Sequence, residues 1–137
     1  MAKSSGITAS VTVDDSGGTG RDISNDITSF SFNTPRGVQD VTGVDKSAFE
    51  RLLLLSDAQF TLNGVFNPAT NKSHDVLKTV PTQAGTITRT VVIGFSAGGT
   101  ATAECVITDY NLSRGQDGSL TWSAPCQLAN GTALSWA

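Results

Sequence analysis

Charged residues are scarce in this chain of 137 residues. They make up 15% of the sequence, against about 25% in ordinary globular domains, and the nine lysines and arginines are scattered, with no two adjacent. Proteins that hold nucleic acid cluster their basic residues to displace counterions from phosphate. A net charge of −3 without such clusters argues against that class. Serine and threonine supply 33 residues instead, which indicates a folded, neutral-polar protein.

Cysteine and histidine are equally sparse. Two cysteines are too few for a disulfide framework, and Cys105 and Cys126 both fall inside strand-like patterns. We therefore interpret them as free thiols in a core. The single histidine, His74, has no second histidine with which to hold a metal. The sequence predicts no cofactor and no metal site.

Long apolar runs are missing as well. The densest are residues 52–55 and 91–95, far short of the roughly 20 residues that cross a bilayer. The first residues carry no apolar segment of the signal-peptide kind. We expect a protein with no membrane partner that is made and folded in a reducing cytosol.

What the sequence has in quantity is alternation of apolar and polar residues. In ITSFSF (27–32) Phe30 and Phe32 share one face and serines the other, the period of a half-buried strand. The fold class predicted is mostly β (α+β): a β-sandwich or open barrel of about six to eight antiparallel strands with one flanking α-helix. The whole chain, 1–137, is expected to form a single domain. The expected strands are 7–13, 27–32, 58–66, 86–96, 101–112 and 119–128.

Residues 47–55 are the strongest helix candidate. Ser47 and Glu50 match the S-x-x-E capping box that begins many helices. A second, shorter helix is expected to begin at Ser73 and to end before Pro81. In the first helix, three residues recur at helical spacing and are expected to pack on the barrel, namely Phe49, Leu52 and Leu53. Two more make its end apolar nearly all round and are candidates for contact with a neighbouring subunit, namely Leu54 and Leu55.

The connection 33–45 is long for a compact domain and is punctuated by proline and glycine. Long connections often carry function or contacts. Apolar side chains and an arginine in a loop suit an anchor on another protein. The residues of this loop that suit such an anchor are Pro35, Arg36, Val38 and Val41. The alternative is that the loop folds back on its own domain.

Two short motifs have both a functional and a structural interpretation. Residues 94–98 match G-x-S-x-G, the nucleophile elbow of α/β-hydrolases. That motif needs a following helix and a downstream histidine, whereas a strand-like segment follows here and His74 lies upstream, so a hairpin turn is favoured. The acidic loop 14–22 resembles one copy of a repeated calcium motif. A flexible hairpin loop is favoured there, and weak cation binding stays open.

Two blocks, residues 22–57 and 104–132, resemble the major tail protein, or tail tube protein, of long-tailed non-contractile bacteriophages (siphophages). The similarity is most specific around TPRGVQDVTG and SRGQDGSLTW, and the order of segments matches over most of the chain. The N-terminal ten residues and the linker 81–86 carry little of it.

The resemblance implies a structural virion protein, not an enzyme. It implies hexameric rings that stack into a tube around a channel for DNA, with sheets from all six subunits closing a barrel and a helix outside it. The implied partners are further copies of the chain, other tail proteins such as the tape measure and terminator, and viral DNA that passes without sequence-specific binding. The implied location is the virion tail, assembled in the cytoplasm of the bacterial host.

The resemblance also implies roles for the loop 33–45, as an inter-subunit or inter-ring contact, for the chain ends and for two acids. Residues 1–6 and 129–137 are candidate terminal arms, with Trp136 as a contact residue. Glu104 and Asp109, placed on opposite faces of one expected strand, are candidates for facing the channel. Alternatives are another ring or tube protein, such as a tail terminator or a secretion-system tube, and a sugar-binding β-sandwich with an exposed aromatic platform.

Overall fold

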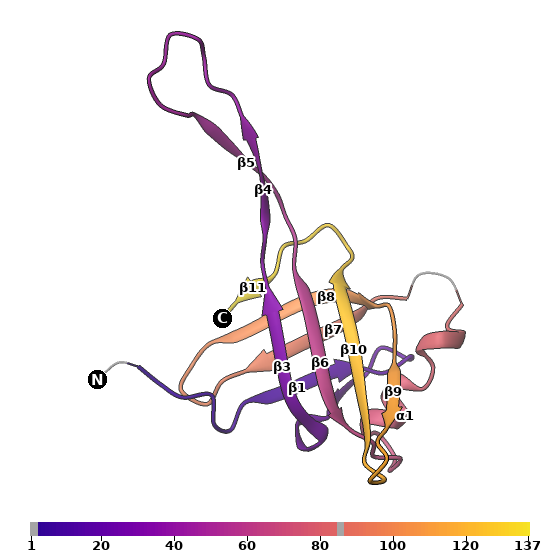
Figure 1. The fold of residues 1–137 in the computed structure, drawn as a ribbon. Helices are drawn as coiled ribbons and strands as arrows, with labels where there is room; N and C mark the ends of the chain where they lie inside the picture. Colours follow the sequence, from indigo (N-terminus) through magenta and orange to yellow (C-terminus); the bar gives the residue numbers. More distant parts are fainter. Residues whose placement is uncertain (1–2, 85–86) are drawn as a thin grey trace.

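The computed structural model describes residues 3–84 and 87–137, and strands account for most of its regular structure (Figure 1). The mostly β, antiparallel class predicted from alternation is confirmed. In chain order the elements are β1 (Ser10–Asp14), β2 (Gly20–Asp22), a 3₁₀ turn (Ser24–Asp26), β3 (Ile27–Asn33), β4 (Arg36–Asp40), β5 (Arg51–Ser56), β6 (Gln59–Val65), α1 (Ser73–Leu77), a second 3₁₀ turn (Val80–Thr82), β7 (Arg89–Gly94), β8 (Thr100–Ile107), β9 (Asn111–Arg114), β10 (Leu120–Leu128) and β11 (Ser135–Trp136).

One continuous sheet folds into two layers that cross each other. Its strand order is β2-β1-β7-β8-β10-β6-β3, with β9 added to β10 and β11 added to β8. In Figure 1 the strands β3, β6 and β10 run across the front of β1, β7 and β8. The inward side chains of both layers form the core. Its fully buried members include Val13, Phe60, Leu62, Val91 and Ile93.

The expected strand 101–112 is interrupted. Ile107 pairs with Cys126 and Asn111 with Ser123, so four steps along one strand match three along β10. The extra residue breaks the ladder, which is how a bulge separates two strands. Asp109 lies exposed in this break. The prediction that Asp109 sits on a strand face is therefore wrong.

The helix predicted at 47–55 is also wrong. Residues 51–56 form β5, which pairs with β4, and the two strands make a separate two-stranded sheet. The backbone amide of Glu50, which in a capping box would donate to the Ser47 hydroxyl, donates to Thr42 Oγ1 at 2.8 Å, so the expected capping box does not form. The helix that does form is the shorter one predicted from Ser73, and Val76 and Leu77 lie in the core.

The start of α1 depends on a residue far away in sequence. The buried carboxylate of Asp26 accepts from the backbone N–H of Ser73 at 3.0 Å and from Asn67 Nδ2 at 2.8 Å. It satisfies a backbone donor that the helix itself leaves without a partner. A tertiary contact therefore caps this helix.

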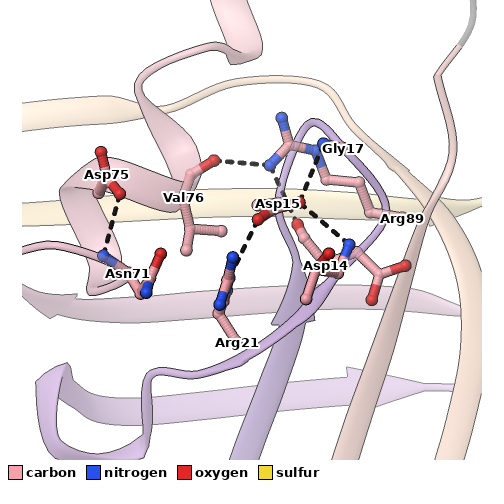
Figure 2. Close-up of polar contacts among 9 residues, drawn as sticks. Asp14, Asp15, Gly17, Arg21, Asn71, Asp75, Val76 and Arg89 are labelled. Carbon is pink, nitrogen blue, oxygen red and sulfur yellow. Dashed lines mark hydrogen bonds and ion pairs between the residues drawn. The ribbon is translucent and has the colours of Figure 1, made fainter.

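A buried arginine holds the other end of α1 against the sheet. Arg89 is 1% exposed on β7, and one guanidinium nitrogen donates to the carbonyl oxygens of Val76 at 2.7 Å and Asp14 at 3.2 Å (Figure 2). The other donates to Thr79 Oγ1 at 3.0 Å and Gln83 Oε1 at 2.8 Å. Burial lowers the pKa of Arg89 from its usual value, and the charges of Asp15 and Asp14 oppose that shift.

Candidate functional site

The β4–β5 hairpin projects away from the two crossed layers (Figure 1). Every residue of both strands is exposed. Apolar side chains on an isolated hairpin are unusual, because a soluble monomer rarely leaves a contiguous apolar patch in water. The large apolar side chains exposed on it are Val38 at 52%, Val41 at 40%, Val44 at 109%, Phe49 at 70%, Leu52 at 53%, Leu53 at 63%, Leu54 at 44% and Leu55 at 91%.

Both faces of the hairpin are apolar. Val38 pairs with Leu53, so these two share one face, and Gln39 pairs with Leu52 on the other face. Ordinary half-buried strands alternate apolar and polar side chains. A ribbon with leucine on both faces needs cover on both sides, which the described part of its own chain does not provide.

Local contacts give the hairpin a defined shape. The Arg36 guanidinium donates twice to the carbonyl oxygen of Leu54, at 3.0 and 2.8 Å. This contact lies at an irregularity where Leu54 and Leu55 together oppose Gly37. A side chain at Gly37 would lie 3.4 Å from the Leu54 side chain, in ordinary contact. The bulge and the arginine together fix the direction in which the leucines point.

Further bonds close the far end and the base of the hairpin. Near the tip, Asp40 accepts from the Thr42 amide at 3.0 Å and the Thr42 hydroxyl at 2.6 Å, which lowers the pKa of Asp40. The guanidinium of Arg51 stacks on the Phe49 ring, with 4.7 Å between its carbon and the ring centroid. At the base, the amide of Asp57 donates to the carbonyl of Pro35 at 3.0 Å.

The structure thus brings most of the predicted contact residues into one element. Pro35, Arg36, Val38, Val41, Leu54 and Leu55 belong to the same hairpin. Phe49, Leu52 and Leu53 belong to it too, and they are exposed, whereas the sequence predicted that they pack on the barrel. The missed feature was the pairing of the two strands. TPRGVQD alone shows no strand period, and a run of four leucines has no period at all.

The C-terminal segment pairs with its own chain. β11 pairs Ser135 with Thr102 and Trp136 with Ala101, and Thr100 and Ala137 exchange two backbone hydrogen bonds of 2.9 Å. Trp136 is 57% exposed, and the centroid of its ring lies 5.8 Å from that of the Phe32 ring. In the candidate N-terminal arm, residues 3–6 are exposed and residues 1–2 lie outside the described residues.

Glu104 lies on the outward face of the β1–β7–β8 layer. Its carboxylate accepts from the Thr90 hydroxyl at 2.7 Å, and the Thr90 amide donates to Asp14 Oδ2 at 3.2 Å. Acidic side chains and a threonine therefore connect three neighbouring strands on this face. Asp109, in the break between β8 and β9, does not join them.

The two short motifs have structural roles. Residues 94–98 lie in a tight turn in which Phe95 and Gly99 are bonded, and Gly98 and Gly99 have φ values of 116° and 96°, which favour glycine. Ser96 Oγ contacts Thr8 Oγ1 at 2.8 Å and the carbonyl of Ile7 at 3.3 Å. His74 Nδ1 instead lies 3.1 Å from the Tyr110 hydroxyl. The expected hairpin turn is confirmed.

In the acidic loop 14–22 the carboxylates already have donors. Asp15 accepts from the amide of Gly17 at 2.9 Å and from the Arg21 guanidinium at 3.0 Å (Figure 2). It also accepts from the amide of Thr19 at 3.0 Å. The Thr19 amide and the Arg21 side chain are the chief reasons that the pKa of Asp15 is low. Within residues 3–84 and 87–137 no group of three potential metal ligands is found. Nor does any helix of that part have the length and apolar character needed to cross a membrane.

Sequence comparison gives no relative for this chain: no protein-family model and no curated protein matches it. Comparison of structures finds chains with the same fold. A chain in the tail of an empty gene transfer agent particle, refined with helical C6 symmetry, matches with a TM-score of 0.76 and 17% identity over 98% of this chain and 99% of that one. This protein has the fold of that tail chain.

Two further structures have the same fold. A chain of the virion of a native gene transfer agent particle matches with a TM-score of 0.74 and 16% identity, over 98% of this chain and 99% of that one. A chain of the six-fold symmetrised anti-feeding prophage baseplate matches with a TM-score of 0.69 and 12% identity, over 98% and 95%. At these identities the likeness establishes the fold, and it extends over at least 95% of each chain.

Proposed function

We propose that this chain is the structural subunit of a phage tail tube, which assembles as hexameric rings stacked around a channel for DNA. The observation that carries the proposal is the exposed hairpin with leucines on both faces. The match over 98% of the chain to a tail chain refined with C6 symmetry supports it. The chain acts by assembly, not by catalysis, and its place is the virion tail.

The hairpin is the contact between rings. Burial of a valine or leucine side chain is worth about 1.5–3 kcal/mol. The exposed fractions of Val38, Leu53 and Leu55 are half or more, so covering the hairpin contributes about 5 kcal/mol per subunit. Repeated six times around a ring, a contact of this size holds rings together without help from charge.

The sheet edges are the contacts within a ring. β2 and β3 end the strand order, and an open edge pairs readily with another chain. In a closed ring each subunit contacts the next through the same rotation, so no sheet edge is left unpaired. Phe32 belongs to the edge strand β3, and the Trp136 ring lies against it, so both side chains add apolar area to the contact at this edge. The remaining partners are the tape measure protein, the terminator protein and the viral DNA that passes through the channel. Assembly takes place in the host cytoplasm.

The likeness to a baseplate chain favours a second candidate, a ring that ends a tube or joins it to a baseplate. The two candidates differ in one outcome. A tube subunit stacks without limit, whereas a terminal ring stops at one or two layers. The first proposal also specifies that the tail is non-contractile.

The test is a concentration series up to the solubility limit, followed by sedimentation velocity and negative-stain microscopy. We expect six-fold rings and tubes with a central channel. The double variant L53Q/L55Q should abolish tubes while leaving monomer stability unchanged, because both side chains are exposed. The matched control L53M/L55M keeps the apolar area and should form tubes. Wild-type monomers at every concentration would refute the proposed assembly, and unchanged tubes in L53Q/L55Q would refute the proposed role of the hairpin.

A further inference from the structure

The strands β3, β6 and β10 contain no charged residue. Together they hold 23 residues, and at the 15% charge of the whole chain about three would be expected. Their inward side chains build the core. Their outward side chains form what we call the neutral face. It is built around three cross-strand pairs of hydroxyl and amide residues, namely Ser31 with Thr61, Asn63 with Ser123, and Gln59 with Gln127.

The neutral face is in contact with water but is not apolar. Ser31 and Gln59 are exposed, and Thr61, Asn63 and Ser123 are half-buried. A face that is covered by a partner in a permanent interface is enriched in large apolar and aromatic side chains. An ordinary outer surface carries about a quarter to a third charged residues. The neutral face fits neither description.

The opposite layer has the usual character of an outer surface. Its outward face carries Asp14 and Glu104, which are linked through Thr90. At the borders of the neutral face charges return, with Asp57 where the layer meets the hairpin and Arg114 at the end of β9. The loss of charge is therefore confined to one face of one layer.

The hairpin gives this layer a direction. Figure 1 shows the β4–β5 hairpin rising from the ends of β3 and β6, so both strands run directly into it. If the hairpin reaches the next ring, β3 and β6 follow the stacking direction. The neutral face then continues from ring to ring along the assembly, facing either the channel or the outside.

We infer that the neutral face of β3, β6 and β10 lines the channel, where it forms a wall that duplex DNA passes without binding. This inference rests on the tail-tube function proposed above. A wall of lysine or arginine would hold phosphates by releasing counterions, and a wall of carboxylates would repel them. Hydroxyl and amide groups keep a layer of water and present no fixed charge. Glu104, which the sequence suggested for the channel, then faces outward.

The native cysteines make a labelling test possible. Cys105 and Cys126 are buried, and burial raises the pKa of each thiol to about 12, so neither reacts readily with maleimide. An introduced cysteine is therefore the only fast site. Thr61→Cys places it on the neutral face, and Thr12→Cys is the matched control, a half-buried threonine on the outward face of the opposite layer.

Each variant is assembled into tubes and treated with N-ethylmaleimide or with a maleimide attached to a globular protein too large to enter the channel. We expect T61C tubes to react with N-ethylmaleimide but not with the large maleimide reagent, which labels T61C monomers. T12C tubes should react with both, and monomers of either variant should react with both. T61C tubes that accept the large reagent would overturn the inference, as would T61C tubes that exclude both reagents.

A second measurement tests the chemistry of the wall. Wild-type tubes should bind short duplex DNA weakly even at low salt, whereas tubes of Thr61→Lys should retain it in a manner that falls steeply with salt. Tight binding by wild-type tubes would refute the neutral wall. If no tubes form under any condition, the proposed function itself fails. If tubes form but label from outside at residue 61, only the inference about the channel fails.

Discussion

Arg89 offers a sharp test of how α1 is held. We consider Arg89→Met, which keeps the length and much of the volume of the side chain but removes the guanidinium. The four acceptors of that group are neutral oxygens at 2.7 to 3.2 Å. Thr79 and Gln83 are partly exposed and can turn their side chains toward water. The Val76 carbonyl belongs to a residue that is 1% exposed, so it loses a donor that water does not easily replace.

The expected loss follows from these contacts. A buried acceptor left without a partner costs about 1–3 kcal/mol, and hydrogen bonds to charged groups contribute about 1.5–3 kcal/mol each. Removing the charge also removes its desolvation cost, which offsets part of the loss. We expect R89M to lower the free energy of unfolding by about 3 kcal/mol. For a chain of this size that corresponds to a fall of about 10 °C in Tm.

The assay is urea unfolding followed by far-UV circular dichroism and by the fluorescence of buried Trp122, whose indole N–H donates to the Val65 carbonyl at 2.9 Å. The control is Arg114→Met, because Arg114 lies on exposed β9 and its nearest acceptor is the Gly115 carbonyl at 3.4 Å. R114M should change stability by less than about 0.5 kcal/mol. Equal stability of R89M and R114M would show that the Arg89 contacts do not hold the helix.

Two other perturbations follow from single contacts. Gly64→Ala should lower the free energy of unfolding by about 1–3 kcal/mol, because its Cβ would overlap the Asp26 carbonyl and lie 2.6 Å from the Trp122 ring. The control is Gly6→Ala, whose Cβ would have no atom within 4 Å. Equal denaturation midpoints for the two variants would contradict the reasoning. Stability should also fall in acid. The hydroxyl and amide of Ser24 lower the pKa of Asp22 below its usual 3.8, so this contribution is complete above about pH 4 and is lost as pH falls through the lowered value. Asp22→Asn should flatten that dependence, and a variant as acid-sensitive as the parent would exclude Asp22 as a cause.

The sequence alone determined the strands whose side chains alternate. Phe30 and Phe32 of β3, or Phe60 and Leu62 of β6, predict their own strand and core face because a period of two is a local property of the chain. The same alternation placed both cysteines in the core. The resemblance to tail tube proteins predicts a contact role for the loop 33–45, and that role stays a prediction.

Tertiary structure decided what the local pattern left undetermined. The leucines of 52–55 fit a helix or a strand equally well, and pairing with β4 across the bulge makes them a strand. α1 begins where a carboxylate 47 residues away accepts a hydrogen bond from its first amide, and it ends where Arg89 donates to the Val76 carbonyl. These choices depend on groups that are distant in sequence and meet only when the two layers cross. The periodicity of a short segment does not predict these contacts, because their free energy contributes only in the folded chain.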